Sequence, residues 1–137
     1  MLAHAPSLFI GFRMLGNLFI ILTSILMSST AHVVLKKGVS SLEQSYSSQS
    51  NSFIDTAWIT ATNVWILGGM TLHVGALVVW LWALSRVDIT FAYPFLALGY
   101  VLVSLMAWFW LGETLTQTRV AGMMIIIIGI IVLSRGG

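Results

Sequence analysis

The sequence predicts an all-α membrane protein in which four transmembrane helices form one small bundle. Only 7% of the 137 residues are charged and 58% are apolar, whereas about 25% of the residues in an ordinary soluble domain are charged. The charged residues are also unevenly placed. They leave four long stretches without any Asp, Glu, Lys or Arg, at Met14–Leu35, Thr56–Ser85, Ile89–Gly112 and Val120–Ser134.

Each stretch is long enough to cross a bilayer, alone or with its flanking residues. A spanning helix needs about 20 mostly apolar residues to cross about 30 Å of hydrocarbon. The last stretch reaches this length if its helix begins near Thr116 and the long side chain of Arg119 extends to the interface. A signal peptide is the alternative for the first stretch, but the polar residues within it argue against one. The expected helices, within a single domain of residues 1–137, lie at about 14–35, 63–85, 90–111 and 116–134.

The connections between these helices predict the topology. A polar loop is expected at about 36–55, because a Ser-rich run such as the one from Ser45 to Ser52 is typical of a flexible connection. The other two connections are short, so the last three helices should be antiparallel neighbours. Four spans place both termini on one side of the membrane. Three basic residues then lie on each side, with Arg13, Arg86 and Arg135 opposite Lys36, Lys37 and Arg119.

This equal division of basic residues bears on orientation and assembly. Orientation follows the bias of Lys and Arg near the span ends, so a tie is compatible with insertion either way round. Four helices pack around side chains rather than around a channel, so a transport role predicts a dimer. The partner is a second copy, antiparallel if the chain inserts both ways, or a related small subunit in a heterodimer.

The last span carries the candidate dimer contact. Gly122 and Gly129 are seven residues apart and return to nearly the same face of a helix. Small residues let two helices approach closely in lipid. We expect these glycines at the dimer interface. The alternative is that they pack the last helix against its own bundle.

Polar residues in the first span follow one face of the helix and lead to a basic end. They occur at Asn17, Ser24, Ser28 and His32, followed by Lys36. The stripe has two interpretations. It either forms hydrogen bonds between helices or lines a hydrated groove in which His32 and Lys36, assisted by Lys37, bind an anionic head group.

Two residues outside the first span complete the set of candidates. His73, in the middle of the second span, faces the same groove or packs between helices. Tyr93 flanks Pro94, where the third helix can open toward a pathway. The candidate substrate-binding residues are therefore Ser28, His32, Lys36, Lys37, His73 and Tyr93.

Several function classes are not indicated by the sequence. The chain has no cysteine, and none of its four acids lies within a span. It contains no arrangement typical of a catalytic triad, a phosphate-binding glycine loop or paired catalytic carboxylates, so we do not expect an enzyme or a cofactor. The three histidines lack the spacing of a metal site. A net charge of +2 is too small to indicate nucleic acid, and membrane lipids are the expected surroundings.

The last third of the chain resembles a known superfamily. The resemblance rests on Phe91-Ala92-Tyr93-Pro94, the run from Tyr100 to Trp108, Leu111-Gly112-Glu113, and Gly122 through Gly129, with Lys36-Lys37-Gly38 after the first helix. These residues resemble the drug/metabolite transporter superfamily and, in size, its small multidrug resistance branch. The resemblance implies a four-helix transporter whose subunits dimerise through the glycine pair of the last helix, often antiparallel.

The chain differs from the small multidrug exporters at one important position. Small multidrug exporters carry an essential glutamate on their first helix, at a place that Ser28 or Ser29 occupies here. A related four-helix group lacks that glutamate, namely the subunits that flip 4-amino-4-deoxyarabinose phosphoundecaprenol across the bacterial inner membrane. The closer resemblance to this group implies a multi-pass inner-membrane protein. Its implied function is that of a flippase-like transporter of a polyprenyl-phosphate-linked or other amphiphilic substrate.

Two other functions remain open at the level of the sequence. A proton-coupled exporter of cationic amphiphiles or drugs would need Glu113, Asp88 or a histidine to replace the missing carboxylate. A non-transporting accessory subunit would need no buried polar groups for transport.

Overall fold

The computed structural model describes residues 5–46 and 53–135, with side chains described for 14–43, 54–55 and 57–135. The described residues form five helices: α1 (Ala5–Tyr46), α2 (Phe53–Thr62), α3 (Val64–Leu84), α4 (Ile89–Leu111) and α5 (Gln117–Arg135). By length and composition, four of them can cross a membrane, namely α1, α3, α4 and α5. The predicted fold class, an all-α membrane protein with four spans, is confirmed.

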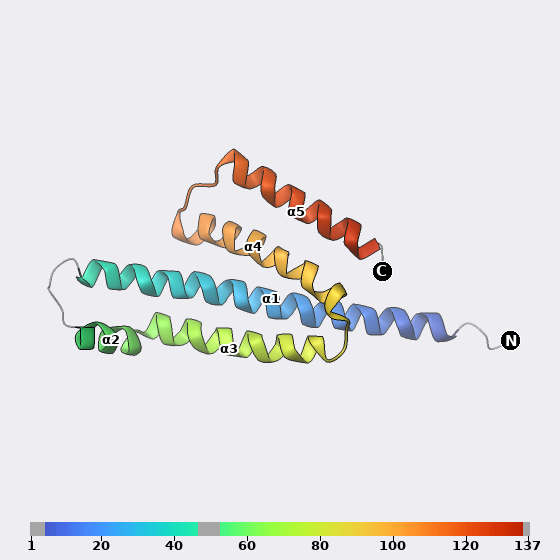
Figure 1. Ribbon diagram of the computed structural model, residues 1–137, viewed down its shortest axis with the longest axis horizontal. Coiled ribbons are helices and arrows are strands. Elements are labelled where there is room, and N and C mark those ends of the chain that lie inside the picture. The colour runs from blue at the N-terminus through green and yellow to red at the C-terminus, as the bar shows by residue number, and fades with distance from the viewer. Residues whose placement is uncertain (1–4, 47–52, 136–137) are drawn as a thin grey trace.

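Helix α1 is the centre of the arrangement. It packs along α3 on one side and against α4 on the other, while α5 lies on the outer side of α4 (Figure 1). The start of α1 and the end of α5 lie toward the same end of the molecule, as an even number of spans requires. One hydrophobic cluster includes Ile21 and Ile25 of α1 and Ala92 and Phe95 of α4, which are all buried. Helix α5 therefore depends on α4 for its packing and leaves its outer face uncovered.

Helix α1 extends well beyond the predicted span. Its 42 residues correspond to about 63 Å at 1.5 Å per residue, about twice the hydrocarbon thickness. The prediction of a loop from residue 36 was wrong, because residues 36–46 continue the helix. Tertiary contacts explain the difference. Leu42 is buried, and a Cβ atom built on Gly38 would lie 2.7 Å from Ile66 Cγ1.

The rest of the predicted loop divides into two parts. Residues 47–52 lie outside the described residues, and residues 53–55 begin the short helix α2. Asn63 then separates α2 from α3, because its Oδ1 accepts hydrogen bonds from the backbone N–H of Trp65 (3.0 Å) and Ile66 (3.2 Å). Such a cap satisfies N–H groups that have no partner at a helix start. The Asn63 side chain also donates to Ser41 Oγ (3.1 Å), which ties this start to the extension of α1.

Helices α1 and α3 approach each other closely at Gly69, as they do at Gly38. A Cβ atom on Gly69 would lie 2.7 Å from Leu35 Cγ and 3.1 Å from the Leu35 backbone nitrogen. The adjacent Gly68 points to open space, with no atom that its Cβ would meet within 4 Å. In lipid, where apolar side chains gain little from leaving solvent, close backbone packing is a main source of helix association. Gly69, like Gly38, is therefore a point at which α1 and α3 pack closely.

Candidate functional site

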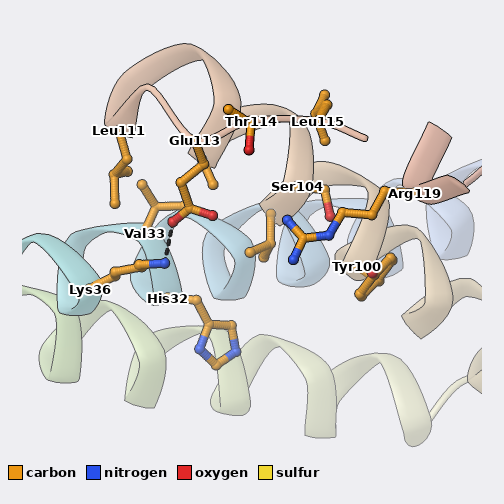
Figure 2. A pocket seen from close by; sticks show the side chains of 12 residues that line it. His32, Val33, Lys36, Tyr100, Ser104, Leu111, Glu113, Thr114, Leu115 and Arg119 are labelled. Atoms are coloured by element: carbon orange, nitrogen blue, oxygen red, sulfur yellow. Dashed lines mark hydrogen bonds and ion pairs between the residues drawn. The ribbon is translucent and has the colours of Figure 1, made fainter. Parts of the chain in front are cut away.

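A cavity of about 200 Å³ lies between α1, α4 and the connection from α4 to α5 (Figure 2). Polar and charged side chains from four parts of the chain line it. They are His32 and Lys36 of α1, Tyr100 and Ser104 of α4, Glu113 and Thr114 of the connection, and Arg119 of α5. Apolar residues such as Val103 and Leu111 complete the walls. Residues far apart in the sequence thus meet at one end of the bundle.

The cavity contains charges of both signs. The Lys36 ammonium forms an ion pair with the Glu113 carboxylate, and the two side chains are 54% and 33% exposed. Figure 2 shows the Arg119 side chain reaching back into the same space from the start of α5. With His32 neutral, the lining carries two positive charges and one negative charge. Its net charge is therefore suited to an anion that can reach Lys36 and Arg119 together.

The turn after α4 places Glu113 in this cavity. Gly112 ends the helix with φ 69° and ψ 21°, a left-handed conformation that costs other residues about 1–2 kcal/mol. The backbone N–H groups of Gly112 and Glu113 both donate to the carbonyl oxygen of Ala107. Two hydrogen bonds of this kind close the end of a helix, and the chain then changes direction. Glu113 is thereby turned back toward α1, where Lys36 lies.

Two further cavities continue from this one into the membrane-spanning region. The first, of about 360 Å³, shares His32, Tyr100 and Val103 with the cavity just described. The second, of about 130 Å³, shares Ile25, Ser28 and Leu96 with the first. The shared lining residues make the three cavities neighbours. We call them together the α1 track, because residues of α1 line all three.

Some polar residues of α1 line this track, and others form hydrogen bonds with nearby backbone groups. Ser28 lines two of the cavities. Ser24 is buried, and its hydroxyl donates to the Ile21 carbonyl oxygen (2.7 Å). Ser29, which is also buried, donates to the Gly99 carbonyl oxygen of α4 over a longer distance of 3.4 Å. Within the stripe, the Ser24 bond stays inside α1 and Ser28 lines a cavity, which favours the groove interpretation. The hydrogen bond between helices comes from Ser29, which lies beside the stripe.

The two spanning histidines meet across the α1–α3 contact. The ring centroids of His32 and His73 are 4.9 Å apart, with the ring planes tilted by 58°. His73 lines the innermost cavity, and its Nδ1 atom is buried without a hydrogen-bond partner among the described residues. The structure thus places both candidates beside the α1 track, as the groove interpretation requires.

Two other candidates lie outside the α1 track. The Lys37 ammonium lies over the Trp65 ring, 4.1 Å from its centroid, on the α3 side of α1. Tyr93 is 53% exposed and packs edge-on against Trp80, with ring centroids 6.0 Å apart. The contact with Trp65 directs the Lys37 side chain toward α3, away from the cavity that Lys36 lines. The sequence treated them as a pair, whereas the structure separates them.

Sequence reasoning did not place five polar residues in this cavity: Tyr100, Ser104, Glu113, Thr114 and Arg119. The sequence offered a partial indication that Arg119 lies near Lys36, because both were expected on the same side of the membrane. The conformation of Gly112 and the packing of α4 on α1 were not visible in the sequence. Among the described residues, no three His, Asp or Glu side chains gather as metal ligands would.

The glycines of α5 do not pack against the bundle. A Cβ atom on Gly122 or Gly129 would meet no atom of another described helix within 4 Å. Met123 and Ile130, each one residue later, are the buried residues of α5. The glycines are therefore turned about 100° from the face that contacts α4. They lie on an open surface of the outermost helix.

Comparison with known proteins identifies a family of small membrane subunits. The chain is 31% identical over 123 residues to a protein of Shewanella sediminis described as "Probable 4-amino-4-deoxy-L-arabinose-phosphoundecaprenol flippase subunit ArnF", covering 84% of this chain and 85% of that one. An ArnF relative from Photorhabdus laumondii is 29% identical over 83% of this chain and 93% of its own length.

Relatives described as ArnE subunits match a shorter part of the chain. The protein from Sodalis glossinidius is 39% identical over 67 residues, which cover 48% of this chain and 60% of that protein. No protein-family model and no solved structure matches the chain. The similarity to ArnF nevertheless extends over most of both proteins. The chain therefore belongs to the family of ArnE and ArnF flippase subunits.

Proposed function

We propose that this protein is a subunit of a flippase that moves a polyprenyl-phosphate-linked amino sugar across the bacterial inner membrane. The observation that carries the proposal is the α1 track, a series of cavities that begins at Lys36 and Arg119 and continues past His32 to Ser28. The names of the relatives, which describe flippase subunits for 4-amino-4-deoxy-L-arabinose-phosphoundecaprenol, support the same substrate class.

The substrate's chemistry matches the two parts of the track. Its polyprenyl tail can stay in the hydrocarbon, so only the sugar and the phosphate need a polar route. Lys36 and Arg119 are the cations that would bind the phosphate at the interface, through charge-assisted hydrogen bonds. Ser28, His32 and His73 would then offer hydrogen bonds to the head group as it passes the apolar region, where unpaired polar groups cost several kcal/mol.

This assignment uses part of the sequence-based candidate set. Lys36, His32, Ser28 and His73 remain proposed substrate contacts, and Arg119 is added. Lys37 and Tyr93 are not included, because their side chains pack against Trp65 and Trp80. The exporter alternative needs a titratable group within the pathway. Glu113 lies at the end of the track, paired with Lys36, so that role would fall to His32 or His73.

Reconstitution tests the proposed function directly. Proteoliposomes containing the chain, alone and together with a related small subunit, should reorient a fluorescent polyprenyl-phosphate-linked pentose faster than protein-free vesicles do. Quenching of outer-leaflet fluorescence measures the rate. If instead a cationic drug moves and carries protons the other way, the exporter alternative is correct. If neither substrate moves in either preparation, the protein is an accessory subunit.

We further propose that α5 forms the contact with the partner subunit. A pair of subunits would enclose a track that the single bundle leaves partly open, and the open face of Gly122 and Gly129 permits close packing. The existence of relatives described as ArnE and as ArnF favours a heterodimer of related small subunits over a homodimer.

Cross-linking tests this contact. The chain has no cysteine, so Ile125→Cys introduces a single thiol on the exposed face between the two glycines, where Ile125 is 70% exposed. We expect this thiol to cross-link to a single cysteine on the last helix of a partner subunit. Leu at both Gly122 and Gly129 should abolish most of the cross-linked product.

The control for this prediction is Gly16→Leu, which adds the same side chain at an open position of α1 and should leave the yield unchanged. The same measurement with two copies of this chain reports on homodimers. An undiminished yield in the double-leucine variant would place the subunit contact on another helix.

A further inference from the structure

The carboxylate of Glu113 is unexpected in a cavity that binds phosphate. Two cations, Lys36 and Arg119, are sufficient for an anion, and a carboxylate beside them repels it. A structural explanation is that Glu113 simply attaches the α4–α5 connection to α1 through Lys36. Exposed ion pairs of this kind contribute only about 0–1 kcal/mol to stability, however. The pair is therefore a weak attachment and an easily exchanged one.

The geometry presents Glu113 to a ligand. Its side chain lines the same cavity as Lys36 and Arg119 and is 33% exposed, so the carboxylate is accessible beside both cations. The left-handed turn at Gly112 sets the backbone of Glu113 beside the cavity. Figure 2 shows the carboxylate directed into the cavity toward Lys36. Glu113 is thus placed to contact whatever displaces the Lys36 ammonium.

We infer that Glu113 binds the ammonium group of a zwitterionic head group while Lys36 and Arg119 bind its phosphate. This inference rests on the proposed function and specifies the substrate further. A phosphodiester-linked amino sugar carries one negative and one positive charge. On entry, the Lys36–Glu113 pair is replaced by a Lys36–phosphate pair and a Glu113–ammonium pair. Every charge in the cavity then has a partner, which a partly desolvated site requires.

Selectivity follows from the same exchange. A head group whose amine is acylated has the same phosphate but no positive charge. Its phosphate would draw Lys36 away and leave the Glu113 carboxylate without a partner, next to a second negative charge. The site therefore favours the ligand that supplies a partner for Glu113 over the ligand that leaves this carboxylate unpaired. Glu113 is therefore a specificity-determining residue that selects amino sugars over their acylated forms.

The test compares two lipid probes that differ only at the amine. One is a polyprenyl-phosphate-linked 4-amino pentose, and the other is its N-acetyl form. The wild-type protein, reconstituted with its partner subunit, should move the amino form about tenfold faster, as expected for one charge-assisted contact. In Glu113→Gln the rate ratio should fall to about one, because the neutral amide no longer distinguishes the two forms.

Two further variants complete the test. Glu43→Gln removes a carboxylate of the same type at an exposed position of α1 outside the cavity, and it should keep the wild-type ratio. Glu113→Asp retains the charge and should retain most of the preference. Thermal unfolding of each variant in detergent confirms that the bundle is intact.

The possible results separate this inference from the proposed function. If the wild-type protein moves both lipids equally, or if Glu113→Gln keeps the preference, the role of Glu113 is refuted while the flippase function stands. Equal slowing of both lipids in Glu113→Gln shows that the residue is only structural. If the wild-type protein moves neither lipid, the proposed function itself fails.

Discussion

Replacing Lys36 by Ala should slow reorientation of the lipid-linked substrate about tenfold, with little change in the stability of the protein. Charge-assisted hydrogen bonds are worth about 1.5–3 kcal/mol, and the lower end applies to a side chain that is half exposed. A loss of about 1.4 kcal/mol corresponds to tenfold in rate. The change also leaves the Glu113 carboxylate without its partner beside the expected phosphate position. The proteoliposome fluorescence assay measures the effect.

The adjacent lysine provides the matched control. Lys37→Ala removes the same charge one residue later, from a side chain that packs over Trp65 rather than lining the cavity. The Lys37→Ala variant should move the substrate at a rate within about twofold of the wild type, since a charge outside the cavity acts on the substrate only through a screened field. Lys36→Arg should retain most of the activity. Equal slowing by Lys36→Ala and Lys37→Ala would assign the effect to general surface charge and remove the phosphate site.

Replacing Gly69 by Leu should destabilise the protein far more than any change to the charges of the cavity. The first added carbon would lie 2.7 Å from Leu35 Cγ and 3.1 Å from the Leu35 backbone nitrogen. A side chain can change its rotamer, but a backbone nitrogen inside a helix cannot move away, so α1 and α3 must separate. Overpacking costs about 3 kcal/mol at such sites. Thermal unfolding in detergent should show a lower Tm and a large unfolded fraction.

Gly68→Leu is the control for this prediction. It adds the same side chain and the same gain in helix propensity, but its Cβ meets no atom within 4 Å. We expect it to unfold at the wild-type temperature. Equal destabilisation by both substitutions would mean that α1 and α3 do not pack through Gly69 in the membrane.

The number and type of the spans could be predicted from the sequence because lipid imposes a local requirement. A helix in hydrocarbon must be apolar over about 20 residues whatever its neighbours are. The helices expected at 63–85 and 90–111 therefore lie within one residue of the ends of α3 and α4. The same stretches could not show where α1 ends. Its extension to Tyr46 is supported by contacts of Gly38 and Leu42, made partly with α3, which begins some 20 residues later.

The candidate site was only partly predictable, for a related reason. The polar stripe on α1 reflects a local helical period, so Ser28, His32 and Lys36 could be selected from the sequence. Glu113 and Arg119 join them only because a left-handed turn at Gly112 brings the α4–α5 connection back onto α1. Lys37 is excluded because its side chain packs over Trp65 of α3.

The sequence by itself thus determined that this is a membrane protein, how many helices span the membrane, and which helix carries a polar face. Each of these depends on residues close together in the chain. Tertiary structure alone decided which charges share a cavity, and that the glycines of α5 face outward rather than into the bundle. Such contacts join residues far apart in the sequence, and their geometry follows from how whole helices pack.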